Sequence, residues 1–214
     1  MAGVEPRALR VYVVTSARFA ERSHRDVAMA ALEGGAGAIQ LRAPGLPDDE
    51  LIAVGSELAR ACADANALFI VNDRPEIAVR VGAGGAHVGR GDDPSEARRL
   101  LGSDRVLGMS VDTASHAREA EDLGADYLGV TVWATPTKPE AVPGGLALVR
   151  DISASTALPI VGIGGIDATN AASVIDAGAA GVAVISAVAA APDPIEATRE
   201  LVRVVDHALE RRGG

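Results

Sequence analysis

Short apolar runs rich in β-branched residues recur eight times along the chain and alternate with segments that have helical spacing. The runs are mostly apolar rather than strictly alternating, which is typical of parallel strands that helices cover on one face. They span residues 9–15, 38–42, 68–72, 85–89, 106–110, 127–130, 159–162 and 181–185. Helices are expected at 24–34, 48–65, 94–101, 114–123, 145–154, 168–177 and 194–211, with a shorter helical turn at 75–81.

Eight strand–helix pairs in about 200 residues indicate a compact (β/α)8 barrel, or TIM barrel. An open doubly wound sheet is the alternative, because alternation of strands and helices fits both architectures. Such a sheet usually has a glycine-rich turn after its first strand, whereas residues 15–18 read Thr-Ser-Ala-Arg. No linker interrupts the chain. The sequence therefore predicts a single barrel domain over residues 1–214.

Helix boundaries are marked by aspartates. Asp73 precedes Pro75 and Asp93 precedes Pro94, while Asp167 stands shortly before a third helix. Because aspartate followed by proline is a frequent helix start, these three residues are expected to be N-caps.

Composition excludes several classes of protein. The 29 acidic residues against 20 basic ones, with 2% aromatic residues, argue against a nucleic-acid-binding surface. The single Cys62 excludes an intrachain disulfide framework and fits a reducing compartment. No signal-peptide pattern is seen, and the longest apolar stretch, residues 177–191, is shorter than a membrane span. A cytoplasmic protein that binds neither nucleic acid nor membrane is expected. Nineteen of the basic residues are arginine, and Lys138 is the one lysine.

Polar residues follow seven of the eight expected strands. In a (β/α)8 barrel this end of the strands carries the active site. The residues found there are Gln40, Arg42, Asn72, Asp73, Arg90, Asp92, Ser110, Thr135, Thr137, Lys138, Gly164, Gly165 and Ser186. Such a ring of amides, carboxylates and cations indicates an enzyme rather than a structural protein.

Asp73 and Asp92 come from adjacent strands and are candidate ligands of one Mg2+ ion, which prefers carboxylates, waters and substrate phosphate oxygens. The alternative is that each caps the following helix, although Asp93 is the better cap and leaves Asp92 free. Arg42, Arg90 and Lys138 would place positive charge beside the metal, as a diphosphate requires. The alternative is that these cations form solvated salt bridges. For Arg74 a solvated salt bridge is the preferred interpretation.

Residues 163–166 read Ile-Gly-Gly-Ile between a strand and a helix, and Ser186 follows the next strand. Backbone N–H groups at these two places match the usual phosphate site of this barrel type, although a plain tight turn would look the same. The histidines are less informative. His24, His116 and His207 are expected on helix surfaces, and His87 in a strand is expected to be a core residue.

These motifs, taken in order, resemble the thiamine-phosphate synthase family. The match covers about residues 9–190. It is carried by Gln-Leu-Arg at 40–42, Asn-Asp-Arg at 72–74, His-Val-Gly at 87–89, Gly-Met-Ser at 108–110, Gly-Ala-Asp-Tyr at 124–127, Thr-Pro-Thr-Lys-Pro at 135–139, Gly-Ile-Gly-Gly-Ile at 162–166 and Ile-Ser at 185–186.

The resemblance implies a Mg2+-assisted transferase. It would condense 4-amino-2-methyl-5-hydroxymethylpyrimidine diphosphate with 4-methyl-5-(2-phosphoethyl)thiazole by a dissociative displacement that releases diphosphate. By position, Asp73 and Asp92 would bind Mg2+. The pyrimidine diphosphate would be held by Gln40, Arg42, Asn72, Ser110 and Lys138, of which Arg42, Ser110 and Lys138 are the candidate catalytic residues. The thiazole phosphate would be held by Thr135, Thr137, Gly165, Ile185 and Ser186.

The chain departs from the family pattern at three places. Pro44 stands where the family usually has lysine, Arg90 stands where it usually has glutamine, and the family's Gly-Pro step after the sixth strand is replaced by Thr131 with one residue fewer. We expect Arg90 to supply the charge that is missing at Pro44, because both loops would overlook the same diphosphate.

Three other functions stay open on the sequence. The related thiazole tautomerases use a histidine two residues beyond the serine after the fifth strand, where this chain has Asp112. An aldolase-type barrel would use Lys138 as a Schiff-base lysine. A non-catalytic binder of thiamine precursors would be favoured by Pro44 and by the shortened loop. The oligomeric state is also open, and a homo-oligomer that packs through its outer helices is possible.

Overall fold

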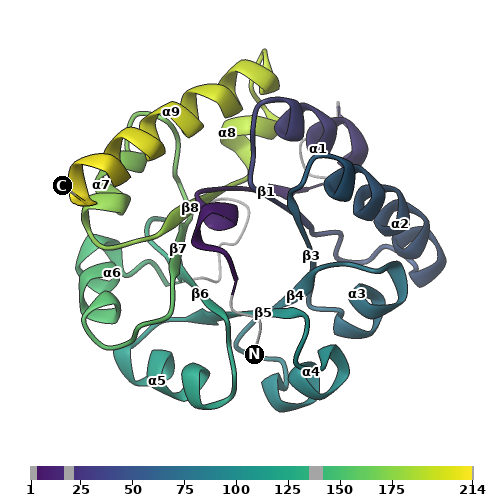
Figure 1. Cartoon of the computed structure of the whole chain (residues 1–214), viewed down its shortest axis with the longest axis horizontal. Helices are drawn as coiled ribbons and strands as arrows, with labels where there is room; N and C mark the ends of the chain where they lie inside the picture. The colour runs from purple at the N-terminus through teal and green to yellow at the C-terminus, as the bar shows by residue number, and fades with distance from the viewer. Residues whose placement is uncertain (1–3, 17–21, 135–141, 214) are drawn as a thin grey trace.

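A computed structural model of the chain describes residues 4–16, 22–134 and 142–213. In this part of the chain, eight parallel strands pair in sequence order, and the eighth pairs with the first to close a barrel. Figure 1 looks down the barrel, with the strands forming a central ring and the helices surrounding it. The predicted (β/α)8 barrel is confirmed, and the open doubly wound sheet is excluded.

The strands closely follow the apolar runs of the sequence. They are β1 (Val11–Thr15), β2 (Ala38–Leu41), β3 (Leu68–Asn72), β4 (Gly85–Val88), β5 (Val106–Val111), β6 (Tyr127–Thr131), β7 (Ile160–Ile163) and β8 (Gly181–Val184). The helices are η1 (Pro6–Leu9), α1 (His24–Glu33), α2 (Asp48–Asp64), α3 (Pro75–Val81), α4 (Pro94–Leu101), α5 (Ala114–Asp122), α6 (Gly145–Ser153), α7 (Ala171–Asp176), α8 (Ser186–Ala189) and α9 (Pro194–Gly213).

Two short helices were not expected. The turn η1 takes up Leu9, which was assigned to the first strand, and packs beneath β1 and β8, where the carbonyl of Leu9 closely approaches Gly181. In Figure 1 this purple segment lies across the central opening of the ring. The other, α8, has only four residues and begins at Ser186, directly after β8.

Side chains within the strands alternate between two cores. The barrel interior holds Tyr12, Val14, Ala38, Ile70, Val106, Tyr127, Val161 and Ala183. Their sequence neighbours, such as Val13 and Ile39, point outward and pack against the helices. Because a strand has a period of two, every second residue faces the interior. Gln40 and Asn72 lie two residues beyond the interior residues Ala38 and Ile70, so they also face the interior, at the carboxyl end of the barrel.

The predicted caps are correct at one of three positions. Asp93 Oδ1 accepts the N–H groups of Ser95 (2.9 Å) and Glu96 (3.1 Å) and caps α4. Asp73 is not the cap of α3, whose N-cap residue is Arg74.

Asp167 does not cap α7 either. Its Oδ1 closes a turn onto the backbone N–H of Thr169 at 2.8 Å, and the helix starts only after Asn170. The helix predicted over 168–177 is therefore shorter at its beginning.

None of the helices in the described ranges is long and apolar enough to cross a membrane. That residues 1–214 form a single domain stays a prediction.

Candidate active site

A cavity of about 550 Å3 opens at the carboxyl ends of the strands and is lined by residues from all eight of them. The described part of the chain contains ten of the predicted site residues, and all ten line this cavity: Gln40, Arg42, Asn72, Asp73, Arg90, Asp92, Ser110, Gly165, Ile185 and Ser186. The other three, Thr135, Thr137 and Lys138, lie outside the described residues. Sequence positions up to 146 residues apart thus meet in one place, from Gln40 to Ser186.

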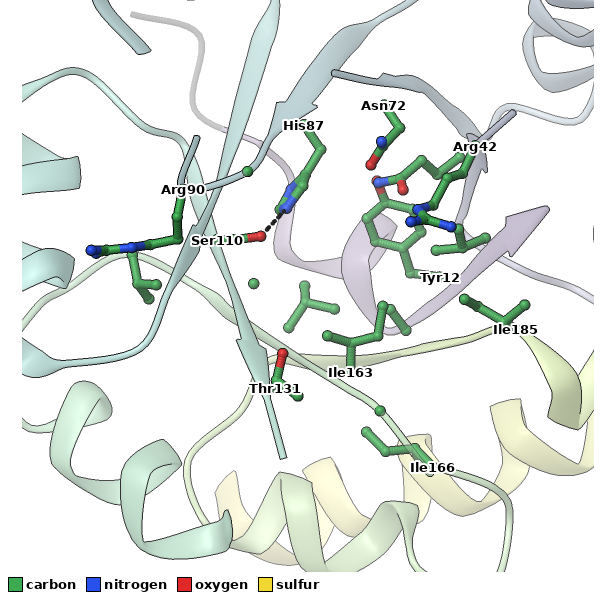
Figure 2. Close-up of a pocket in the computed structure, with 18 of the residues that line it drawn as sticks. Tyr12, Arg42, Asn72, His87, Arg90, Ser110, Thr131, Ile163, Ile166 and Ile185 are labelled. Carbon is green, nitrogen blue, oxygen red and sulfur yellow. Dashed lines mark hydrogen bonds between the residues drawn. The ribbon is translucent and has the colours of Figure 1, made fainter. Parts of the chain in front are cut away.

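The cavity has a polar side and an apolar side. In Figure 2, Arg42 and Asn72 lie close to Tyr12 in the upper part of the view, whereas Ile163, Ile166 and Ile185 lie below them. The amide of Gln40, which is 5% exposed, belongs to the polar side and donates from Nε2 to the hydroxyl of Tyr12 at 2.7 Å. A ligand with one strongly polar part and one flat apolar part would match both sides.

Asp73 and Asp92 approach the same space beside Gly89. A Cβ atom built on Gly89 would lie 3.4 Å from Asp92 Oδ2 and 4.0 Å from Asp73 Oδ1. The backbone of Asp73 is left-handed, with φ of 58°, which is uncommon for a non-glycine residue and is found most often in Asn and Asp. Its N–H donates to the carbonyl of His87 at 2.8 Å, which holds the end of β3 against β4. The two carboxylates therefore face a common cradle beside Gly89, which a side chain at position 89 would enter.

The donor set of this cradle fits Mg2+. Hard divalent cations of this size bind one or two carboxylates and complete their coordination with water and phosphate oxygens. Among the described residues no group of three His, Cys, Asp or Glu side chains forms a metal cluster, so the remaining ligands would come from substrate and water. The described lining carries two arginines, Arg42 and Arg90, against three aspartates, which is an unfavourable balance for a diphosphate without an additional cation.

The turn after β7 requires glycine. Gly164 has φ of 97° and Gly165 has φ of 62°, and a Cβ on Gly164 would lie 2.4 Å from the carbonyl oxygen of Trp133. Both residues line the cavity, as do Ile185 and Ser186 at the start of α8. This combination of a glycine turn after strand seven and a short extra helix after strand eight is the usual phosphate site of the fold.

Arg90 lines the cavity, but its guanidinium is engaged at the rim. Nη1 lies 3.4 Å from Asp112 Oδ1, and both side chains are about half exposed. In Figure 2 the side chain of Arg90 extends away from Arg42 and Asn72. Arg74, by contrast, forms the predicted surface salt bridges, with Asp48 at 2.8 Å and with Glu76.

Two histidines make contacts that the sequence does not predict. His24, expected on a helix surface, is partly buried on α1, and its Nδ1 lies 2.7 Å from the hydroxyl of Thr15 at the end of β1. Burial lowers the pKa of His24 below its usual value. His87 lies inside the barrel with a hydrogen-bond partner at each ring nitrogen, as expected of a core histidine, but its ring also lines the cavity and lies 3.0 Å from the hydroxyl of Ser110. His116 contacts Asp112 at the rim, and His207 is exposed as expected.

Tyr12 and Tyr127 were missed by the sequence analysis. They are the only two tyrosines of the chain, both lie inside the barrel, and their hydroxyls are 3.0 Å apart. Burial raises the pKa of both phenols well above 10, and the charge of one would raise that of the other further, so both keep their protons at neutral pH. Their position in apolar strand rows makes them indistinguishable from core residues in the sequence. Contacts between strands connect them to the site, of Tyr12 with Gln40 and of Tyr127 with His87.

The closed barrel, the two-sided cavity at its carboxyl end and the glycine turn after β7 define a barrel enzyme that binds phosphorylated ligands. A family model described as "Thiamine monophosphate synthase" matches residues 11–188. The chain belongs to the thiamine-phosphate synthase family, whose members are transferases that couple a thiazole to a pyrimidine.

Individual relatives support this assignment. The chain is 48% identical over 206 residues to a thiamine-phosphate synthase of Roseiflexus sp. (strain RS-1), covering 94% of this chain and 87% of that protein. It is 49% identical over 199 residues to that of Moorella thermoacetica, covering 92% and 95%. A solved structure of thiamine phosphate pyrophosphorylase from Pyrococcus furiosus superimposes with a TM-score of 0.89 at 38% identity, covering 95% of this chain and 98% of that one.

Proposed function

We propose that this cavity condenses 4-amino-2-methyl-5-hydroxymethylpyrimidine diphosphate with 4-methyl-5-(2-phosphoethyl)thiazole to form thiamine phosphate and diphosphate. The bond from the pyrimidine methylene carbon to the diphosphate oxygen breaks first, and the diphosphate leaves with both electrons. The electron-rich aminopyrimidine stabilises the cation, and the thiazole nitrogen then forms the new carbon–nitrogen bond. Such a reaction needs charge stabilisation and positioning more than proton transfer.

The observation that carries the proposal is the division of the cavity into two sides that suit the two substrates. Gln40 and Asn72 present amides and Arg42 a guanidinium on the polar side, as an aminopyrimidine with a diphosphate requires. The glycine turn directly follows Ile163 and the start of α8 directly follows Ile185, and all of these residues line the cavity, so a flat thiazole with a phosphate tail would fit there.

We assign the site residues accordingly. The pyrimidine diphosphate is held by Gln40, Arg42, Asn72, Arg90, Ser110 and Lys138. The thiazole phosphate is held by Thr135, Thr137, Gly165, Ile185 and Ser186. Arg42 and Lys138 neutralise the leaving group, and Ser110 directs a hydrogen bond to it, because guanidinium, ammonium and hydroxyl groups are the usual donors to phosphate oxygens.

Mg2+ is the proposed cofactor, with Asp73 and Asp92 as its protein ligands. Bound there, it would neutralise the diphosphate and make it a better leaving group. The support is the pair of carboxylates facing the cradle at Gly89 and the acidic balance of the described lining. We further propose a single-domain, cytoplasmic protein that uses small-molecule substrates and is able to form a homo-oligomer.

The test is to supply both precursors to the purified protein with and without Mg2+ and to follow diphosphate release and thiamine phosphate formation. We expect both products in equal amounts, only in the presence of the metal and only with both precursors. Binding of the precursors without any diphosphate release would identify a non-catalytic binder instead. Conversion of the thiazole alone would identify a tautomerase.

A further inference from the structure

A continuous chain of hydrogen bonds runs across the floor of the cavity and joins two of the proposed substrate-binding side chains. Gln40 Nε2 donates to the hydroxyl of Tyr12 (2.7 Å), which lies 3.0 Å from the hydroxyl of Tyr127. That hydroxyl lies 3.1 Å from His87 Nδ1, and His87 Nε2 lies 3.0 Å from Ser110 Oγ. We call this set, Gln40, Tyr12, Tyr127, His87 and Ser110, the floor chain. It connects β2, β1, β6, β4 and β5.

The barrel makes room for this arrangement with two glycines. In the register of the sheet, Gly108 lies between His87 and Tyr127, and Gly129 pairs with Ser110. A Cβ on Gly108 would lie 2.1 Å from the ring of Tyr127, and one on Gly129 would lie 2.9 Å from the ring of His87. The two rings occupy this space with their centroids 5.5 Å apart. The strands are therefore built around the rings, and the hydrogen bonds are not an incidental result of side-chain rotation.

A single direction of donation runs through the whole floor chain when Tyr12 donates to Tyr127. Gln40 Nε2 can only donate, so the oxygen of Tyr12 accepts from it; either hydroxyl of the tyrosine pair could donate to the other, and with Tyr12 as that donor the proton of Tyr127 is left over. Tyr127 in turn has its proton for His87 Nδ1, because burial keeps both phenols protonated. A neutral imidazole that accepts at Nδ1 carries its proton on Nε2, which then donates to Ser110 Oγ. The proton of Ser110 is consequently not used within the chain.

We propose that Tyr12, Tyr127 and His87 are positioning residues that hold the two ends of the floor chain for the pyrimidine diphosphate. They fix the amide of Gln40 in one orientation and turn the hydroxyl proton of Ser110 into the cavity as a donor. The inference rests on the proposed function, since it takes Gln40 and Ser110 to contact that substrate. It adds that the contacts of Gln40 and Ser110 with this substrate are coupled, because the same chain of hydrogen bonds sets the orientation of the amide and the direction of the hydroxyl proton.

The tautomer of His87 tests the direction of the chain without any substrate. A long-range 1H–15N spectrum of the protein labelled with 15N-histidine, recorded at about pH 8, above the usual imidazole pKa, distinguishes the two neutral tautomers. The signal of His87 is identified by its loss in His87→Asn. We expect the proton on Nε2 in the wild-type protein and a mixture of tautomers in Tyr127→Phe. A proton on Nδ1 in the wild type would overturn the proposal.

Kinetics test whether the chain acts through Ser110. Tyr127→Phe removes one hydroxyl, and the loss of one hydrogen bond predicts a fall in kcat of about 3- to 10-fold. Thr198→Val is the matched control, because it removes a buried hydroxyl on α9 that donates to the carbonyl of Pro194 at 2.8 Å, outside the cavity lining. Thermal unfolding of both variants separates lost stability from lost positioning. A kcat within twofold of the wild type in Tyr127→Phe would exclude a positioning role.

The double variant gives the sharpest comparison. In a Ser110→Ala background the proton that the chain directs is absent, so Tyr127→Phe should cause less than a twofold further loss. Losses that multiply in the double variant would show that Tyr127 does not act through Ser110. If Tyr127→Phe does not fold, Tyr12→Phe interrupts the same chain one bond earlier. If the wild type releases no diphosphate, the proposed function fails, and the tautomer measurement alone then decides whether the chain holds Ser110.

Discussion

Asp92 and Asp93 are neighbours in the sequence but use their carboxylates in opposite ways. Asp92 Oδ2 turns back to accept the N–H of Gly89 at 2.7 Å and faces the cavity, whereas Asp93 Oδ1 turns forward and caps α4. Two adjacent aspartates thus have different roles, one as a candidate metal ligand and the other as a helix cap. Substitutions at the two positions can therefore be compared directly.

Asp92→Asn should weaken the response to metal, while Asp93→Asn should not. Asparagine can still accept the N–H of Gly89 but has no charge for Mg2+, so we expect the Mg2+ concentration at half-maximal activity to rise about tenfold or more. At position 93 asparagine is as good an N-cap as aspartate, and stability and metal response should be retained. Titration of activity with Mg2+ measures both variants. Equal metal responses would remove Asp92 from the proposed site.

Arg90→Gln tests whether Arg90 replaces the lysine that is missing at Pro44. An exposed ion pair such as Arg90–Asp112 contributes only about 0.2–1 kcal/mol, so a diphosphate can compete for the guanidinium. We expect Arg90→Gln to raise the KM for the pyrimidine diphosphate about 3- to 10-fold. Asp112→Asn, which releases Arg90 from its partner, should leave that KM unchanged or lower it. Unchanged turnover and diphosphate affinity in Arg90→Gln would show that no compensation occurs.

Gly164→Ala should affect one substrate more than the other. Alanine at φ of 97° is strained and its Cβ would collide with the carbonyl oxygen of Trp133, so the turn after β7 must shift. We expect the KM for the thiazole phosphate to rise about tenfold, with the KM for the pyrimidine diphosphate changed less than twofold. Steady-state kinetics with each substrate varied in turn provides its own control. A larger change for the pyrimidine diphosphate would place the thiazole phosphate elsewhere.

Stability should decline at alkaline pH for identifiable reasons, because Cys62, Tyr12, Tyr127 and Lys138 are the only side chains that titrate in that range. Burial raises the pKa of Cys62 from 9.0 to about 12 and raises those of both tyrosines above 10. Above the unfolded values the unfolded chain releases these protons while the folded chain keeps them, so the free energy of unfolding falls as pH rises.

The loss should begin between about pH 8 and 9 with Cys62, amount to about 2 kcal/mol by pH 10 with the first contribution of the phenols, and steepen as the phenols titrate further. Denaturant unfolding between neutral pH and about pH 11 measures the slope. Cys62→Ala should remove the first part of the decline, and Tyr127→Phe should flatten the second. Slopes that are identical in wild type and both variants would contradict the assignment.

The fold could be predicted from the sequence because its signals are local. Each apolar run and each helix start, such as Asp93 before Pro94, depends on a few adjacent residues, and eight repetitions leave few architectures. Two errors show the limit. Leu9, the last residue of η1, looks like part of a strand because it continues an apolar run. Asp73 looks like a cap because Pro75 follows, yet its left-handed backbone serves the end of β3 instead.

The candidate site was predictable only where polar residues end a strand. Gln40, Asn72 and Ser110 are visible because their polarity breaks an apolar run. Tyr12 and Tyr127 are not visible in this way, since a tyrosine inside an apolar strand has the pattern of a core residue. Their role depends on contacts across the barrel, between positions 115 residues apart, which no local pattern records.

Lys138→Arg is the remaining prediction, and it concerns the one lysine among 20 basic residues. A compact ammonium on a flexible stem can follow a departing diphosphate, whereas a planar guanidinium needs a fixed two-pronged partner. We therefore expect Lys138→Arg to lower kcat about tenfold or more although the charge is kept, with Arg105→Lys as a control for an arginine that is not part of the cavity lining. Borohydride added with a carbonyl substrate should give no covalent adduct, because the ammonium acts by its charge. Full activity in Lys138→Arg would mean that any cation suffices there, and an adduct would favour a Schiff-base enzyme instead.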